Sequence, residues 1–153
     1  MRPMDCCAFE MGARMGRVRN SEVDQLLLFA ERSRSCLGTT DARCRDALRH
    51  RMRRGEVVKP APGVYARSAY WSGLPERERA LHVMRAQQKL HPDWVFCGFS
   101  AALAHGLPIA YREIGQSHLA SSSECRHSPR KGVRWHVVDG VRPVTMQGIR
   151  VTS

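Results

Sequence analysis

The chain lacks several features that would each mark a class of protein. No apolar run approaches the roughly 20 residues of a membrane-spanning helix, because the most apolar window covers only residues 26–30. Arginines scattered through residues 1–20 leave no signal-peptide core. C-x-x-C pairs, glycine-rich phosphate loops and G-x-S-x-G motifs do not occur, so the usual sequence signals for zinc, nucleoside triphosphate and hydrolase chemistry are missing.

Cysteine is present, but without the context of a disulfide framework. A secretory signal would be needed to place the six thiols in an oxidising compartment, and the sequence has none. We therefore expect a cytoplasmic protein, not associated with a membrane, whose cysteines are reduced: Cys6, Cys7, Cys36, Cys44, Cys97 and Cys125.

Acidic residues are scarce relative to basic ones. The chain holds 25 Lys and Arg against 14 Asp and Glu, a formal net charge of +11. Only 3 of the cations are lysines and 22 are arginines, a bias that a GC-rich genome can produce. Genome composition does not explain the excess over acids, however, so the charge favours a polyanionic partner such as nucleic acid.

The order of predicted elements indicates an α+β fold. We expect a helix over residues 21–32, a turn at 35–40, a second helix over 41–54 and a β-hairpin over 56–67. That order predicts a winged helix-turn-helix over residues 21–70, after a flexible tail at 1–20.

The rest of the chain, 71–153, is expected to form a small mixed α/β domain. It begins with a helix at 76–90, and a short helix at 101–105 capped by Ser100 follows. Short strands are expected at 94–97, 118–120 and 133–138, with a final hairpin near 144–151.

The second predicted helix is amphipathic in an unusual way. At about 100° per residue, Cys44, Ala47, Leu48 and Met52 share one side, and arginines 45, 49 and 53 line the other. Like charges at i, i+4 destabilise an isolated helix, so such a row indicates an anionic ligand. The alternative is a solvated helix face, which is what most charge runs are. Arg51 departs from the pattern, because it points back toward the apolar side.

The predicted partner is double-stranded DNA, contacted by the basic helix and the wing. A homodimer on an inverted repeat is a reasonable arrangement, since operator symmetry mirrors protein symmetry. The candidate DNA-binding residues are cations and a histidine of these elements: Arg43, Arg45, Arg49, His50, Arg53, Arg54, Lys59 and Arg67.

Several segments resemble one family in their order and spacing. Residues 47–58 with 62–66, then F-S-A-A-L-A-H-G-L-P at 99–108, and finally 132–136 and 148–153, are similar to AbiEi-type antitoxins. The resemblance implies DNA binding through the wing and second helix, repression of the protein's own promoter, and antagonism of a nucleotidyltransferase toxin by a separate C-terminal region.

The chain departs from that family at two places. Arg51 stands where the family usually has an aliphatic residue. Relatives also continue beyond the segment that ends here at 153, so we expect a chain truncated relative to them, a stand-alone regulator or a gene remnant. The alternative function is a protein-interaction module, in which residues 92–153 bind an acidic partner such as a cognate toxin.

Enzymatic, metal and cofactor chemistry find little support in the sequence. His118 and His136 lie on alternating strands and could face one another, which is more typical of half-buried polar residues than of ligands. Cys125 and His127 are spaced more tightly than usual zinc ligands. We predict no enzyme activity, no metal and no cofactor; a nucleic-acid enzyme would require a further C-terminal domain.

Overall fold

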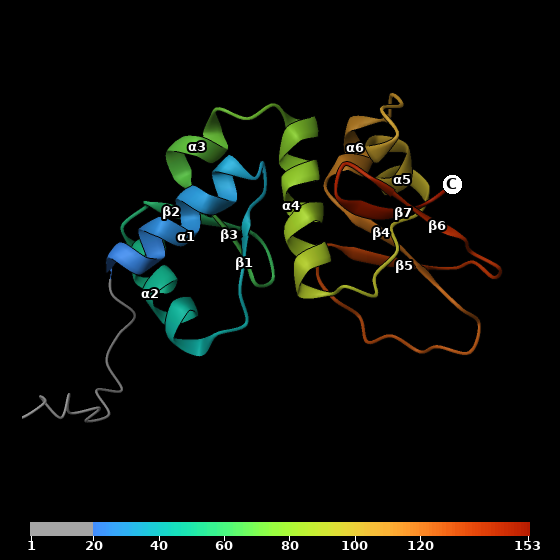
Figure 1. Ribbon diagram of the computed structural model, residues 1–153, viewed down its shortest axis with the longest axis horizontal. Helices are drawn as coiled ribbons and strands as arrows, with labels where there is room; N and C mark the ends of the chain where they lie inside the picture. Colours follow the sequence, from blue (N-terminus) through green and yellow to red (C-terminus); the bar gives the residue numbers. More distant parts are fainter. Residues whose placement is uncertain (1–19) are drawn as a thin grey trace, which may run out of the picture.

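The computed structural model describes residues 20–153, and in it two groups of elements flank one central helix (Figure 1). The first group comprises α1 (Asn20–Arg32), β1 (Leu37–Gly38), α2 (Ala42–Arg53), β2 (Val57–Ala61), β3 (Val64–Arg67) and α3 (Ser68–Ser72). The central helix is α4 (Glu76–Leu90). The predicted tail at 1–20 falls outside the described residues, except that Asn20 already belongs to α1.

Helices α1 and α2 form because each has one apolar face to bury against the other. Val23 and Leu27 of α1 and Leu48 of α2 are at most 1% exposed and share one core cluster. The apolar face predicted for α2 is thereby confirmed. The opposite side of α1 is more open, since Phe29 is 67% exposed.

Strands β1, β3 and β2 form an antiparallel sheet in that order. The predicted hairpin is confirmed as β2 and β3, and Gly63 at its tip has φ of 72°, which a type II turn requires at its third position. The turn predicted at 35–40 is partly wrong, because Leu37 and Gly38 pair with Tyr65 and Val64 as an edge strand. Burial of Cys36 and Leu37 favours this pairing over a free turn.

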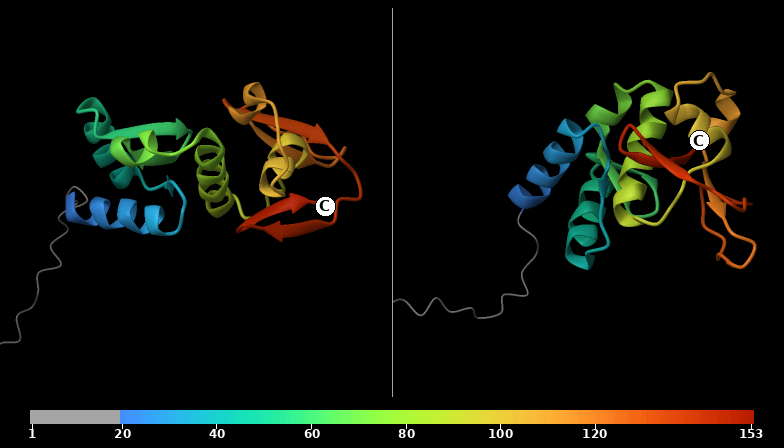
Figure 2. Two further views of the ribbon diagram at one scale, coloured as in Figure 1. Left: turned by 90° about the horizontal axis from the view of Figure 1, so that it is seen from above. Right: turned by 45° about the vertical axis from the view of Figure 1, so that its right-hand side comes forward.

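Helix α4 packs against both groups of elements, as the two further views show (Figure 2). On the first side, Ala86 and Leu90 pack with Cys36 and Val64. On the other side, Leu81 and Met84 enter the core of the second half. The helix was predicted over the same residues, but its two-sided burial was not.

The second half contains α5 (Gly98–Ala104), α6 (Tyr111–Ile114), β4 (Ser117–Ser121), β5 (Val133–Val137), β6 (Pro143–Met146) and β7 (Ile149–Thr152). Strands β4 and β5 are parallel, and β6 and β7 are antiparallel. Phe96, fully buried, joins the two pairs: its N–H donates to the Arg150 carbonyl at 2.8 Å and its carbonyl accepts from Thr152 N–H at 2.9 Å.

The sequence predicts that Ser100 caps a short helix, and this prediction is wrong. Helix α5 begins earlier, at Gly98, and Ser100 is a buried residue inside its first turn. Its Oγ instead accepts a hydrogen bond from the backbone N–H of His118 at 2.9 Å, which ties α5 to β4.

The fold is thus a mixture of helices and small sheets of the predicted α+β class. The boundary predicted between residues 70 and 71 falls inside α3. No helix of residues 20–153 is long and apolar enough to cross a membrane.

Candidate nucleic-acid interface

The start of the basic helix α2 is fixed by Asp41. Its carboxylate accepts hydrogen bonds from the backbone N–H groups of Arg43 at 2.7 Å and Cys44 at 3.0 Å. These bonds, from Cys44 first and Arg43 second, hold the pKa of Asp41 below its ordinary value of 3.8. The helix therefore begins at a capped, ionised residue that satisfies two of its first N–H groups.

The arginine row predicted on α2 is exposed on the side away from the core. Arg43, Arg45, Arg49, His50 and Arg53 are all exposed, whereas Cys44 and Leu48 are buried. Arg49 makes a 3.3 Å contact with Asp46 one turn earlier, with both side chains more than half exposed. Within residues 20–153, Arg43, Arg45 and Arg53 have no ion pair.

Arg51, which the sequence pattern left unexplained, is a structural residue. Its guanidinium donates to the carboxylate of Asp24 and to the backbone carbonyl of Asn20 at 2.9 Å. The Arg51 side chain is only 12% exposed, and its hydrogen bond is the first cause of a lowered Asp24 pKa. Arg51 thus joins α2 to the first turns of α1, and its direction does not require a shift of the helix register.

The remaining predicted cations are held by partners within the chain. Arg54 donates to Glu56 just beyond α2. Arg67 forms a two-pronged pair with Glu31 of α1, and this hydrogen-bonded pair raises the Arg67 pKa above its ordinary value. Lys59 lies exposed on β2, with its Nζ 5.8 Å from the ring centroid of Tyr65. The structure therefore groups the free cations on α2 and leaves Arg54 and Arg67 at its margin.

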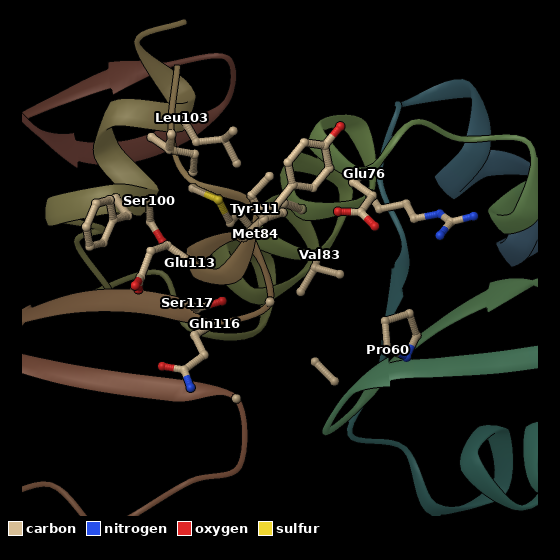
Figure 3. Close-up of a pocket in the computed structure, with 18 of the residues that line it drawn as sticks. Pro60, Glu76, Val83, Met84, Ser100, Leu103, Tyr111, Glu113, Gln116 and Ser117 are labelled. Atoms are coloured by element: carbon tan, nitrogen blue, oxygen red, sulfur yellow. The ribbon is translucent and has the colours of Figure 1, made fainter. Parts of the chain in front are cut away.

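A cavity of about 330 Å³ lies between the tip of the β2–β3 hairpin and the second half (Figure 3). Pro60 stands on one side, and Tyr111, Glu113 and Ser117 stand on the other. Met84 of α4 is among the apolar residues between them. Its polar and apolar walls could admit a small molecule, but residues 20–153 offer no nucleophile paired with a base there.

The two strand histidines do face one another, as predicted. His118 Nδ1 and His136 Nε2 are 2.9 Å apart, and the rings are stacked. Burial first, then the neighbouring His136, lowers the His118 pKa below its ordinary value of 6.5. His118 Nε2 lies 3.8 Å from Glu113 and has no hydrogen-bond partner among the described residues. This favours a neutral His118 ring with only one of its two nitrogens hydrogen-bonded.

Cysteine, histidine and carboxylate side chains are spread through residues 20–153. That part of the chain contains no group of three or more His, Cys, Asp or Glu side chains placed to hold a metal ion. Its four cysteines are unpaired, and burial raises the pKa of the Cys36 thiol to about 12. Such a thiol is a packing group and not a nucleophile at neutral pH.

Comparison with known proteins returned no match, whether to a family model, a curated protein or a solved structure. The geometry of α2 and the hairpin is consequently the main basis for inferring function.

Two features of this half of the molecule are not apparent from the sequence. Glu113 lines the cavity and lies beside the histidine pair. It belongs to α6, a helix of one turn that is too short to show a periodic pattern of apolar residues. A group of stacked rings from distant segments also escaped notice, because His91 and Trp94 are far in sequence from His127 and Trp135. Pairing of strand segments brings these residues together, and periodicity within one segment cannot show that.

Proposed function

We propose that the chain binds double-stranded DNA through α2 and the β2–β3 hairpin. The observation that carries this proposal is the row of exposed, mostly unpaired arginines on α2, opposite a face buried against α1. Cations so placed neutralise phosphates and release condensed counterions, and guanidinium groups can bond guanine in the major groove.

The order of elements supports a winged helix-turn-helix for the first half. A helix, a short strand, a second helix and a two-stranded hairpin follow one another, and α1 packs on α2. One feature differs from the simplest form of that motif: the α1–α2 connection spans residues 33–41 and contains β1, where a turn of three or four residues is usual. Under this proposal α2 enters the major groove and the hairpin lies along the backbone.

The regulatory role is proposed from the motifs shared with AbiEi-type antitoxins. In that role the protein represses its own promoter, as a dimer if the operator is an inverted repeat. The DNA-binding proposal does not depend on that role, because it rests on α2.

The test is a binding titration with the duplex from the gene's own upstream region and a scrambled duplex of equal length. Replacing Arg45 and Arg49 together by Ala should weaken binding to both duplexes, because phosphate contacts are lost. The matched control is Arg32→Ala with Arg142→Ala, which removes two exposed cations outside α2 and the hairpin. Equal loss in both variants would show that only overall charge matters, and would contradict the assignment of α2.

A second candidate function is binding of an acidic protein through the second half. The observation in its favour is the exposed apolar edge of β5, where Val137 is 69% exposed and the next residue, Val138, is 38% exposed. Replacing Val137 by Glu should abolish co-purification with an acidic partner encoded by the neighbouring gene, because the new carboxylate repels that partner, and should leave DNA binding unchanged. Loss of co-purification in the Arg45/Arg49 variant instead would place the contact on α2.

A further inference from the structure

A cluster of stacked rings lies in the second half of the chain, where the segment after α4 meets the long loop between β4 and β5 and strand β5 (Figure 1). We call it the ring cluster: His91, Trp94, His127 and Trp135. The His127 ring lies flat on Trp135, with centroids 3.6 Å apart and planes 5° apart. His91 stacks on Trp94 at 3.9 Å, and the two indoles meet edge to face at 5.6 Å.

The ring cluster lines a cavity of about 460 Å³. Its walls come from residues 90–94, from 120–122 at the end of β4, and from Cys125, His127 and Trp135. This volume is within the range of pockets that bind small organic molecules. Flat rings on several sides make the cavity suited to a flat guest, because aromatic rings stack favourably face to face with an offset or edge to face.

One cation is fixed against the rings of the cavity. The Arg130 guanidinium lies 5.6 Å from the centroid of Trp94, and its Nη1 is 3.2 Å from Nε2 of His91. Since an arginine can only donate, His91 accepts this bond as a neutral ring. Burial first, and Arg130 second, correspondingly lower the His91 pKa below its ordinary value of 6.5.

The charge of the surrounding segment is also mainly positive. Arg126, Lys131 and Arg134 are exposed on the same loop and strand. Three carboxylates oppose them: Asp93 in the cavity wall, Glu124 in the loop, and Asp139, which accepts hydrogen bonds from Ser123 of the same loop. A polyanion whose backbone runs along the loop would therefore meet more positive than negative charge.

One donor of the ring cluster is unused. The indole Nε1 of Trp135 is buried and has no hydrogen-bond acceptor within residues 20–153. A buried N–H without a partner costs free energy, so a guest that brings an acceptor such as a base carbonyl gains by supplying one. The histidine rings offer further polar edges beside it.

We propose that the ring cluster binds single-stranded nucleic acid, with a base stacked in the cavity and phosphates against Arg126, Arg130 and Lys131. Stacked aromatic side chains in a positively charged groove are the features that bind unpaired bases without sequence preference. A duplex is a poor guest, because its bases already stack on one another. The site is separate from α2, so it does not depend on the proposed binding of duplex DNA.

The test uses the fluorescence of the two indoles at the site. In the full chain with Trp71→Phe, the remaining tryptophans are Trp94 and Trp135. Oligothymidylate and oligouridylate of about eight nucleotides, within the range of small single-strand-binding domains, are titrated separately at low salt. Saturable quenching by either oligomer is expected, weakening as salt rises.

Four variants in that background separate the site from general charge. His127→Ala with Arg130→Gln should weaken binding about tenfold, since a stacking ring and a cation are lost; both side chains are exposed, so folding should be retained and can be checked by circular dichroism. His127→Phe keeps a ring and should retain binding. Arg32→Gln controls for charge, and Arg45→Ala with Arg49→Ala controls for α2; both should bind as the parent does.

Three results would overturn the proposal. The first is that neither oligomer quenches the tryptophan fluorescence, even when the oligomer is in large excess over the protein. The second is equal weakening by Arg32→Gln, which would indicate diffuse charge. The third is loss of single-strand binding in the Arg45/Arg49 variant, which would assign the binding to α2 and leave the duplex proposal standing.

Discussion

Single side chains decide how α2 is oriented, and Arg51 is the most informative of them. By its sequence position, Arg51 falls on the apolar face of α2. A charged residue there does not fit a helix that buries this face and contacts DNA with the opposite one. The structure shows Arg51 reaching across to Asp24 and Asn20 of α1, with 12% of the side chain exposed. The arginines of α2 therefore have two distinct roles: Arg51 holds the helix in place, and Arg45, Arg49 and Arg53 face outward.

Replacing Arg51 by Met should lower the free energy of unfolding by about 1 kcal/mol. The variant loses a hydrogen-bonded ion pair and a bond to a backbone carbonyl, but Asp24 is half exposed and is solvated once alone. Arg53→Met, an exposed change on the same helix, is the control and should cost less than about 0.5 kcal/mol. Urea denaturation measures both; equal losses would mean that Arg51 is not the link between the helices.

Buried histidines should make the protein less stable in mild acid. His82 and His118 are each 1% exposed, and burial is the first cause that lowers the pKa of both below 6.5. The unfolded chain thus binds protons that the folded chain does not, so stability is retained above pH 6.5 and is lost as pH falls below it.

The melting temperature should accordingly be lower at pH 5 than at pH 7.5. Replacing His118 by Gln should lessen that difference, because the group that titrates has been removed, even if the variant is less stable at neutral pH. An unchanged melting temperature between the two pH values would show that the folded and unfolded chains bind the same number of protons over this range, and would contradict the prediction.

At the scale of elements, the sequence predicts what local patterns determine. Periodic apolar residues and capping residues located α1, α2 and α4, and Pro62–Gly63 located the hairpin tip. Strand β1 and helix α6 were missed, because two or four residues carry no period and form through partners distant in sequence. The candidate site followed the same rule: the arginine row of α2 was predictable, and the ring cluster was not.

Packing of β1 against α4 is tight enough to exclude a side chain at Gly38. A Cβ there would lie 3.0 Å from the Ala86 carbonyl oxygen and 3.0 Å from Leu90 Cγ. Gly38→Ala should therefore destabilise the chain by about 1–3 kcal/mol, the usual cost of overpacking. Gly115→Ala is the control, since a Cβ at Gly115 meets nothing within 4 Å. Thermal denaturation of both variants tests this packing; equal stability would contradict it.

At the scale of the whole molecule, α4 is the helix against which both halves pack. It contacts β1 and β3 on one side and α5, α6 and β7 on the other. Arg85 of α4 reinforces this arrangement, because it donates to the Arg34 carbonyl at 2.7 Å and to the Gln147 carbonyl at 2.9 Å. Under the proposals above, α2 lies in the first half and the ring cluster in the second, and α4 packs between the two halves (Figure 1).

The salt dependence of duplex binding tests the central claim most directly. The slope of log K against log salt counts the phosphates that cations neutralise. Replacing Arg45 and Arg49 by Ala should reduce the magnitude of that slope by about 2 and weaken binding, because each arginine on a phosphate contributes about 1. Arg32→Ala should leave the slope unchanged. An unaltered slope and affinity in the Arg45/Arg49 variant would contradict the assignment of α2 as the DNA-binding helix.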